Sequence, residues 1–225
     1  KLRMRSQAFC ILIIFSSMLP GCRGKQTEAV KERPGPVQVR DSTYLFNGKT
    51  LDGWEITNFG TQGPVYVSDD EIILGMGDGC TGVTWKGKFP VSDYEVTLEA
   101  KKVDGNDFFC GMTFPAGEYP CTLIIGGWGG TVVGLSSING LDASENETTI
   151  NRSFAKDRWY KISLTVTHSK IEAWIDDEIV IDFTIGDNVL SIRPEVALSL
   201  PFGIASWRTT SALRNIRLLP VSGNN

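Results

Sequence analysis

Strict alternation of apolar and polar residues over short segments constrains the fold of this chain more than any other feature. In Tyr94–Lys101 every second residue is apolar, which is typical of a strand with one face on a core. Residues 159–176 contain two more such segments, separated by a tight turn at His168-Ser169, and a turn at Asp176-Asp177 precedes the next one. Because no helical period extends beyond a turn, the sequence predicts an all-β fold, a two-sheet antiparallel sandwich over about residues 44–220.

The first 22 residues have the pattern of a bacterial export signal. Three basic residues precede an apolar run from Ala8 to Leu19, which is shorter than the roughly 20 residues that a membrane-spanning helix needs. The run ends in Leu19-Pro20-Gly21-Cys22, which resembles the lipobox whose cysteine receives a lipid. Ordinary secretory cleavage with an unmodified Cys22 is the alternative. We therefore expect an exported lipoprotein, anchored to the membrane in the periplasm or at the cell surface.

The rest of the chain divides into a tether, one domain and a short tail. Residues 23–43 are rich in Lys, Glu, Arg and Pro and carry almost no large apolar side chain, so we expect a flexible tether. Residues 44–220 are long enough for one domain with a sizeable core, and residues 221–225 form the tail. The formal net charge is −4 at pH 7 and no basic stripe is present, which disfavours nucleic acid as a partner.

Three cysteines remain outside the export signal and the lipobox: Cys80, Cys110 and Cys121. Cys110 and Cys121 flank residues 115–118, so a hairpin turning there would place them opposite each other, within reach of a disulfide that leaves Cys80 free. Three buried thiols are an equally good interpretation, because free cysteine packs as a small apolar residue. No CxxC and no Cys/His spacing is present, so the sequence predicts no metal site and no cofactor.

A short segment near the start of the predicted domain combines turns with aromatic anchoring. Residues 44–54 contain Asn47-Gly48 and Asp52-Gly53, two dipeptides that tolerate positive φ and can each turn the chain. Four apolar side chains around these turns are available for burial: Leu45, Phe46, Leu51 and Trp54. We expect Trp54, and likewise Trp159, to lie in the core and anchor strands.

The same segment carries a family resemblance. Leu45–Trp54 reads LFNGKTLDGW and resembles the opening signature of the 3-keto-disaccharide hydrolase family. Residues 105–109, 158–177 and 212–218 resemble further blocks of that family in the same order, so the resemblance covers the whole predicted domain. It implies a concanavalin-A-like jelly roll and a hydrolase acting on 3-keto-glycosides. In that chemistry a base removes the acidified C2 proton, the glycosidic bond breaks by elimination, and water adds.

Two motifs common in that family are missing from this chain. A Y-E-x-Q strand corresponds to Tyr119–Leu123, which lacks the carboxylate, and a Q-x-H-G motif corresponds to Ser199–Gly203, which lacks the histidine. These departures favour a second function, a noncatalytic lectin-like carbohydrate-binding module on a surface lipoprotein. A purely structural or adhesive lipoprotein is a third. Carbohydrate is the expected partner in the first two cases.

The densest cluster of candidate site residues is the acidic loop 142–148. It follows Trp128, which is bracketed by four glycines and could stack on the apolar face of a sugar ring. We expect Glu145 to act as the base, Asp142 as the acid or as an orienting group, and Glu147 to bind substrate. The alternative is a solvated loop beside glycines that let two strands approach.

A second wall of the site is expected near the end of the chain. Trp207-Arg208 lies close to the stretch that replaces the family's histidine motif, and Arg208 could donate hydrogen bonds to a keto or hydroxyl oxygen. His168, the single histidine, is assigned to a surface turn rather than to catalysis.

Overall fold

A computed structural model describes residues 42–221 of the chain. The predicted export signal, its Cys22 and nearly all of the predicted tether lie outside the described residues. None of the helices within residues 42–221 has the length and apolar character needed to cross a membrane.

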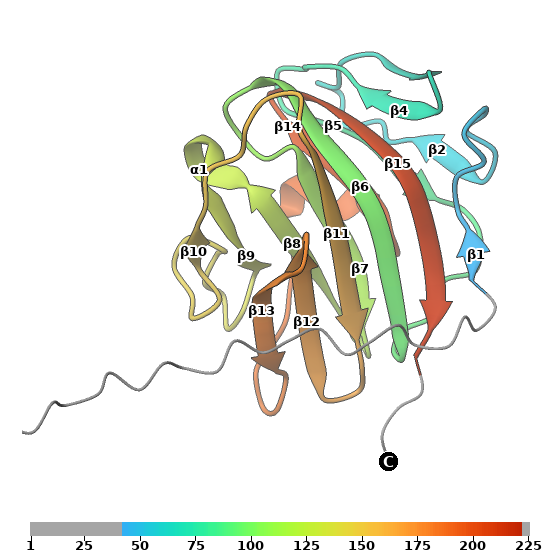
Figure 1. Cartoon of the computed structure of the whole chain (residues 1–225). Helices are drawn as coiled ribbons and strands as arrows, with labels where there is room; N and C mark the ends of the chain where they lie inside the picture. The colour runs from blue at the N-terminus through green and yellow to red at the C-terminus, as the bar shows by residue number, and fades with distance from the viewer. Residues whose placement is uncertain (1–41, 222–225) are drawn as a thin grey trace, which may run out of the picture. The chain divides into compact units, whose positions relative to one another are not determined.

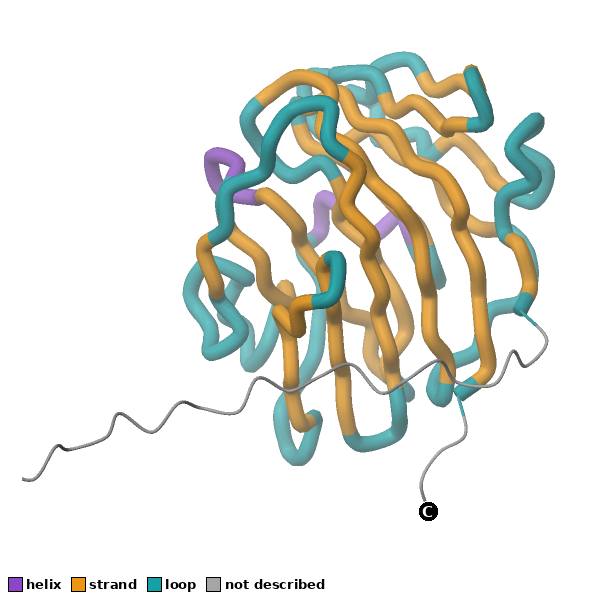
Figure 2. The backbone as a smooth tube through the Cα atoms, viewed as in Figure 1, coloured by secondary structure: helices purple, strands orange, loops and turns teal. Residues whose placement is uncertain are grey.

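Two antiparallel sheets pack face to face, and loops supply most of the remainder (Figures 1 and 2). The first sheet, in the described part of the chain, has eight strands: β13 (Glu178–Thr184), β12 (Lys170–Ile175), β11 (Trp159–Val166), β6 (Tyr94–Gly105), β15 (Thr209–Pro220), β4 (Glu71–Leu74) and β3 (Val65–Ser68), with β1 (Thr43–Tyr44) also paired to β15. The second has seven: β10 (Ile150–Asn151), β9 (Val132–Ser136), β8 (Tyr119–Gly126), β7 (Cys110–Ala116), β14 (Gly203–Trp207), β5 (Cys80–Trp85) and β2 (Trp54–Ile56). Two short helical turns, α1 (Gly127–Gly130) and η1 (Pro194–Ser199), complete the fold.

The first sheet follows the alternation in the sequence. Along β6 the side chains are alternately buried and half-buried, and its partner β11 is in register so that Leu98 lies opposite Ile162. Hairpins turn at His168-Ser169 and at Asp176-Asp177, where Ile175 pairs with Glu178 across a two-residue loop. The predicted antiparallel sandwich is therefore confirmed.

The turn segment at residues 44–54 anchors the chain as its sequence predicts. The Asn47 Oδ1 atom accepts hydrogen bonds from the backbone N–H groups of Lys49 and Thr50, at 2.7 and 2.8 Å. Gly53 has φ of 82°, and a Cβ atom there would lie 2.5 Å from the Trp85 ring. The Trp54 side chain is buried against Trp85, and its Nε1–H donates to the Leu45 carbonyl at 2.7 Å.

Trp159 does not occupy the core, so that prediction is wrong. Its side chain is partly exposed, with the Lys101 ammonium 4.5 Å and the Arg214 guanidinium 4.0 Å from the ring centroid. Because side chains alternate between the faces of a strand, the neighbouring Tyr160 is the one that is buried between the sheets.

The pairing of Cys110 with Cys121 is also not formed. The hairpin does turn at Gly117-Glu118, but the register places Cys110 opposite Ile125 and Cys121 opposite Phe114. The two-residue loop lies closer in sequence to Cys121 than to Cys110, so the two cysteines fall at different levels of the ladder. Cys80, Cys110 and Cys121 are free and buried, which is the alternative that the sequence left open.

The second sheet has buried side chains on both of its faces. In β8, Leu123 and Ile125 point into the core between the sheets, whereas Ile124 points to the opposite face. There it belongs to a second hydrophobic cluster, which we call the outer cluster: Cys80, Phe108, Ile124, Val132, Ala143, Val196 and Ala205. The segment through η1 lies over this face, tied to it by a hydrogen bond from Thr84 Oγ1 to the Leu198 carbonyl at 3.1 Å.

The two tryptophans allow a direct test of this packing. We expect Trp54→Ala to lower the free energy of unfolding by about 3–5 kcal/mol, because it removes a buried ring and a buried hydrogen bond. Trp159→Ala removes a surface ring between two cations and should cost about 1–2 kcal/mol. Urea unfolding followed by circular dichroism measures both values, and equal losses for the two variants would contradict the assignment.

Candidate functional site

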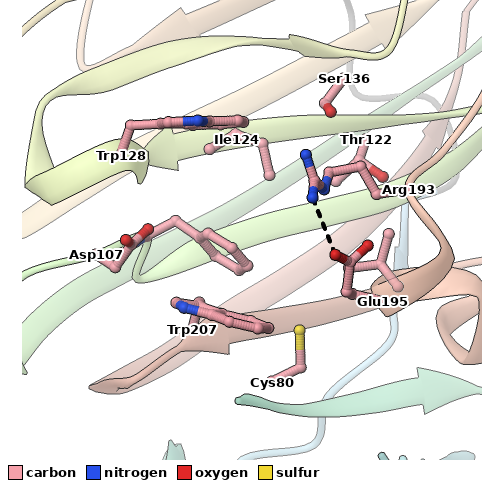
Figure 3. A pocket seen from close by; sticks show the side chains of 11 residues that line it. Cys80, Asp107, Thr122, Ile124, Trp128, Ser136, Arg193, Glu195 and Trp207 are labelled. Carbon is pink, nitrogen blue, oxygen red and sulfur yellow. Dashed lines mark hydrogen bonds and ion pairs between the residues drawn. The ribbon is translucent and has the colours of Figure 1, made fainter. Parts of the chain in front are cut away.

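A cavity of about 190 Å³ opens on the outer face of the second sheet. Figure 3 shows Trp128 and Trp207 on opposite sides of it, with Asp107 near one end and an ion pair of Arg193 and Glu195 across from it. The side chains that line it come from strands β5, β8, β9 and β14 and from three connecting segments: Cys80, Asp107, Phe108, Thr122, Ile124, Trp128, Ser136, Arg193, Glu195, Val196 and Trp207.

Trp128 is presented to the cavity by an unusual turn. The residue itself has φ of 47°, and Gly126, Gly129 and Gly130 also have positive φ values, of 80°, 87° and 101°. A run of such dihedrals is tolerated because the neighbours are glycines. A Cβ atom at Gly127 would lie 2.7 Å from the Ile124 side chain, so the turn also packs closely on the strand below. The result is a large aromatic side chain that is 42% exposed.

Trp207 forms the opposite wall at the end of β14. The following residue, Arg208, has φ of 43° and is held by the loop at Asp78 and Gly79. Its Nε–H donates to the Asp78 carbonyl at 2.9 Å, and its backbone N–H donates to the Gly79 carbonyl at 3.1 Å. The Arg208 guanidinium lies 5.9 Å from the Trp207 ring centroid. Arg208 therefore packs beside Trp207 and does not line the cavity itself.

An arginine between two carboxylates provides the charge at one end of the cavity. Arg193 donates to Glu195 Oε1 at 2.9 Å and forms a close ion pair with Asp142. Asp142 also accepts hydrogen bonds from the hydroxyls of Ser136 and Ser137, at 3.3 and 3.0 Å. Asp142 thus connects the acidic loop to the segment that leads into η1 and holds Arg193 in place.

The ion pair shifts the ionisation of both partners. The hydrogen bond from Arg193 lowers the pKa of Glu195, an effect reinforced by a backbone hydrogen bond, and the bond to Glu195 raises the pKa of Arg193. A carboxyl with a lowered pKa stays ionised to a lower pH than an unpaired carboxyl. Glu195 is therefore an anion at neutral pH and a weaker base than an unpaired glutamate.

Asp107 stands at the opposite end of the cavity from this pair. Its Oδ1 atom accepts the backbone N–H of Phe108 at 2.8 Å, and its own N–H donates to Thr209 Oγ1 at 3.0 Å. Both contacts fix the loop between β6 and β7. Among the described residues Asp107 has no ion-pair partner, so its carboxylate is not neutralised by a neighbouring cation.

The base of the cavity belongs to the outer cluster and is apolar. Phe108, Ile124 and Val196 are buried there beside the Cys80 thiol. Burial raises the pKa of Cys80 to about 12, with a further contribution from the charges of Glu195 and Asp107. Cys80 is therefore a neutral thiol at physiological pH and contributes to the cavity as an apolar group.

The residues predicted from sequence are distributed unevenly around this cavity. Trp128 and Trp207 lie on its walls. Asp142 does not line the cavity but forms an ion pair with Arg193, which does. Glu145 and Glu147 are exposed on the acidic loop and do not line it. No three His, Cys, Asp or Glu side chains within residues 42–221 are grouped closely enough to hold a metal ion.

Three charged residues of the cavity were not selected from the sequence. Asp107 stands inside the block at residues 105–109 that carries part of the family resemblance, which was a usable signal. Arg193 and Glu195 flank Pro194 between two apolar residues, a pattern that is common in surface loops and gives no sign of an inward-facing pair.

The chain belongs to the family of 3-keto-α-glucoside-1,2-lyase-like domains, whose model matches residues 41–219. No curated protein matches the chain at the level of sequence.

Solved structures with little sequence similarity share the fold. A candidate glycosyl hydrolase from Parabacteroides distasonis is 14% identical, with 80% of this chain and 94% of that chain covered and a TM-score of 0.52. The carbohydrate-binding module CBM66 from Bacillus subtilis is 16% identical over 77% and 98% of the two chains, with a TM-score of 0.50. A Bacillus subtilis protein of unknown function with a galectin-like fold is 10% identical over 75% and 90%, with a TM-score of 0.54. These similarities establish the sandwich architecture.

Differential alkylation tests the state of the three cysteines. At pH 8 we expect iodoacetamide to leave Cys80, Cys110 and Cys121 unmodified in the folded protein, because all three thiols are buried and the pKa of each is raised to about 12. All three should react in urea without prior reduction. Peptide mapping by mass spectrometry measures this, and a Cys110–Cys121 disulfide in the unreduced protein would contradict the structure.

Proposed function

We propose that the protein is an exported enzyme that cleaves 3-keto-glycosides by base-assisted elimination followed by hydration. The observation that carries the proposal is the cavity itself, which combines two tryptophan walls with carboxylates and an arginine in one space. Tryptophan faces suit the apolar faces of sugar rings, and the charged groups suit proton transfer and oxyanion stabilisation. Membership of the 3-keto-α-glucoside-1,2-lyase-like family supports the choice of substrate.

The chemistry needs few protein groups. The carbonyl at C3 acidifies the C2 proton, and a base removes that proton while the electrons move onto the C3 oxygen. When the carbonyl re-forms, the electrons make a C1–C2 double bond and expel the glycosidic oxygen, which takes a proton from water. Addition of water across the double bond then gives the free 3-keto sugar. The protein must supply a base for C2 and a donor for the transient oxyanion.

The cavity offers one residue for each of these roles. Asp107 is the proposed base, because it carries no ion pair among the described residues, whereas the pKa of Glu195 is lowered by Arg193. Arg193 is the proposed oxyanion donor, since its guanidinium stays charged at any working pH. Glu195 and Asp142 hold the guanidinium from two sides and so fix its direction.

Deuterium exchange tests the reaction class. The purified protein should cleave a 3-keto-α-glucoside but not the corresponding glucoside, which lacks the activated C2 proton. In D₂O the released sugar should carry deuterium at C2, which mass spectrometry and NMR detect. Cleavage of both compounds without label at C2 would indicate direct hydrolysis instead and would contradict the proposed route.

Charge-neutral substitutions test the assignment of the base. We expect Asp107→Asn to lower kcat by about 10²- to 10⁴-fold with the fold intact, because the amide cannot accept the proton. The exposed residue Glu118, in the hairpin turn between β7 and β8, provides a matched control as Glu118→Gln. The sequence-based hypothesis makes Glu145 the base. Comparing Glu145→Gln with Asp107→Asn therefore distinguishes the two assignments of the base. Loss of activity in Glu145→Gln with Asp107→Asn unaffected would move the base to the acidic loop.

A noncatalytic lectin-like module is the second candidate function. It is favoured by Thr122, an uncharged residue that lines the cavity within β8, the strand in which the family resemblance leads us to expect a carboxylate. Such a module would bind saccharides without turnover. Trp128→Ala should then weaken saccharide binding by about 1–3 kcal/mol, measured by isothermal titration, through lost stacking and apolar burial. Turnover by the wild-type protein would exclude this function.

Export and lipid anchoring are the remaining part of the proposal. They are supported by the pattern of residues 1–22, in which an apolar run ends at Cys22. We expect the mature protein to begin at a diacylated Cys22 and to accumulate as a precursor when cells are treated with globomycin. Mass spectrometry of the N-terminus measures this, and an unmodified Cys22 in a protein cleaved elsewhere would contradict it.

A further inference from the structure

The outer face of the second sheet is apolar where a saccharide-binding surface would need hydrogen-bonding groups. Ile124 of β8, Ala205 of β14 and Cys80 of β5 all point outward there, and Phe108 and Val196 close over them. These residues are 9% exposed or less, so water has little access to the base of the cavity. A group that rests on this base gains apolar burial and finds no hydrogen-bond partner.

The two hydroxyl side chains that line the cavity each make a hydrogen bond within the protein. Thr122 Oγ1 shares a hydrogen bond with Thr113 Oγ1 at 3.1 Å, and Ser136 donates to Asp142 at 3.3 Å. The charged groups that a ligand can meet lie at the two ends of the cavity, at Asp107 and at the Arg193–Glu195 pair. A second sugar ring would leave several hydroxyls unpaired in the apolar part, at about 1–3 kcal/mol for each buried group.

From this arrangement we infer that the substrate is a glycoside with a flat aromatic aglycone, which binds over the outer cluster between Trp128 and Trp207. The sugar then lies above the aglycone, across the mouth of the cavity between Asp107 at one end and Arg193 at the other, where its hydroxyl and keto oxygens find partners. This inference rests on the proposed function and specifies its substrate class. A disaccharide would satisfy the charged ends equally well but not the apolar base.

The two tryptophan walls favour an aromatic aglycone over one that is only apolar. Two indole rings in one small cavity offer stacked or edge-to-face partners for a third ring, and each such pair contributes about 0.5–1.5 kcal/mol beyond apolar burial. The sulfur of Cys80 adds a polarisable contact of a kind that favours aromatic rings. An aliphatic group of equal size would gain the burial but not these contacts.

Three glycosides of 3-keto-glucose with the same anomeric configuration test the inference: methyl, cyclohexyl and phenyl. We expect the KM of the phenyl glycoside to be about 10-fold lower than that of the methyl glycoside, with the cyclohexyl glycoside between them. Trp207→Leu keeps an apolar wall but removes the ring, so it should abolish the advantage of phenyl over cyclohexyl while leaving the advantage of both over methyl. Lys86→Ala, on the exposed end of the sheet, serves as the matched control.

Binding of the unoxidised phenyl and methyl glucosides, measured by isothermal titration, separates this inference from the proposed function. If neither 3-keto-glycoside is cleaved but phenyl glucoside binds about 10-fold more tightly than methyl glucoside, the proposed function fails and the aromatic site stands. If the 3-keto compounds are cleaved with equal KM values, or a 3-keto-disaccharide is preferred to the phenyl compound, the inference is overturned and the function stands. Both comparisons use the wild-type protein, so a variant that fails to fold does not affect the outcome.

Discussion

The structure depends on one constraint, which is that the second sheet buries both of its faces. Every residue of β7 and of β9 is buried, because one face packs on the first sheet and the other lies beneath loops. A strand buried on both sides needs apolar residues at nearly every position, and β7 and β8 meet that need with side chains such as Phe114, Leu123 and Ile124. The first sheet has no such cover, so its outer face carries charged pairs such as Arg214 with Glu99.

The cover over the second sheet creates the cavity. The segment leading into η1 and the acidic loop lie over the sheet and are joined by the contact of Arg193 with Asp142. Where this cover is incomplete, the apolar outer face is left open between Trp128 and Trp207. The carboxylates and the arginine therefore stand at the rim of an apolar surface, where low polarity strengthens their electrostatic interactions.

The sequence predicted the first sheet more fully than the second, and the reason is the same burial. Alternation in residues 94–101 and 159–176 reports a sheet with one exposed face, and the turns at His168-Ser169 and Asp176-Asp177 were located correctly. Strands buried on both faces have no alternation to detect. Local spacing also could not show that the hairpin turns asymmetrically between Cys110 and Cys121, since that depends on register. The outward direction of Trp159 does follow from the alternation, because Tyr160 lies on the buried face of β11.

The walls of the site were accessible to sequence reasoning because each is tied to a local backbone requirement. A tryptophan among four glycines indicates a turn that only such neighbours permit, and the structure shows Trp128 displayed by that turn.

The charged groups have no local requirement of this kind. Asp107 lies in the loop between β6 and β7 and Glu195 lies in η1, two segments that are far apart in the chain. They line the same cavity because β7, β8 and β14 are neighbours in the second sheet. A charged loop such as residues 142–148 looks the same in sequence whether its side chains face a cavity or the solvent, and here Asp142 turns inward to Arg193 while Glu145 remains exposed. The direction of a loop carboxylate is therefore decided by the cation that the tertiary fold brings to it.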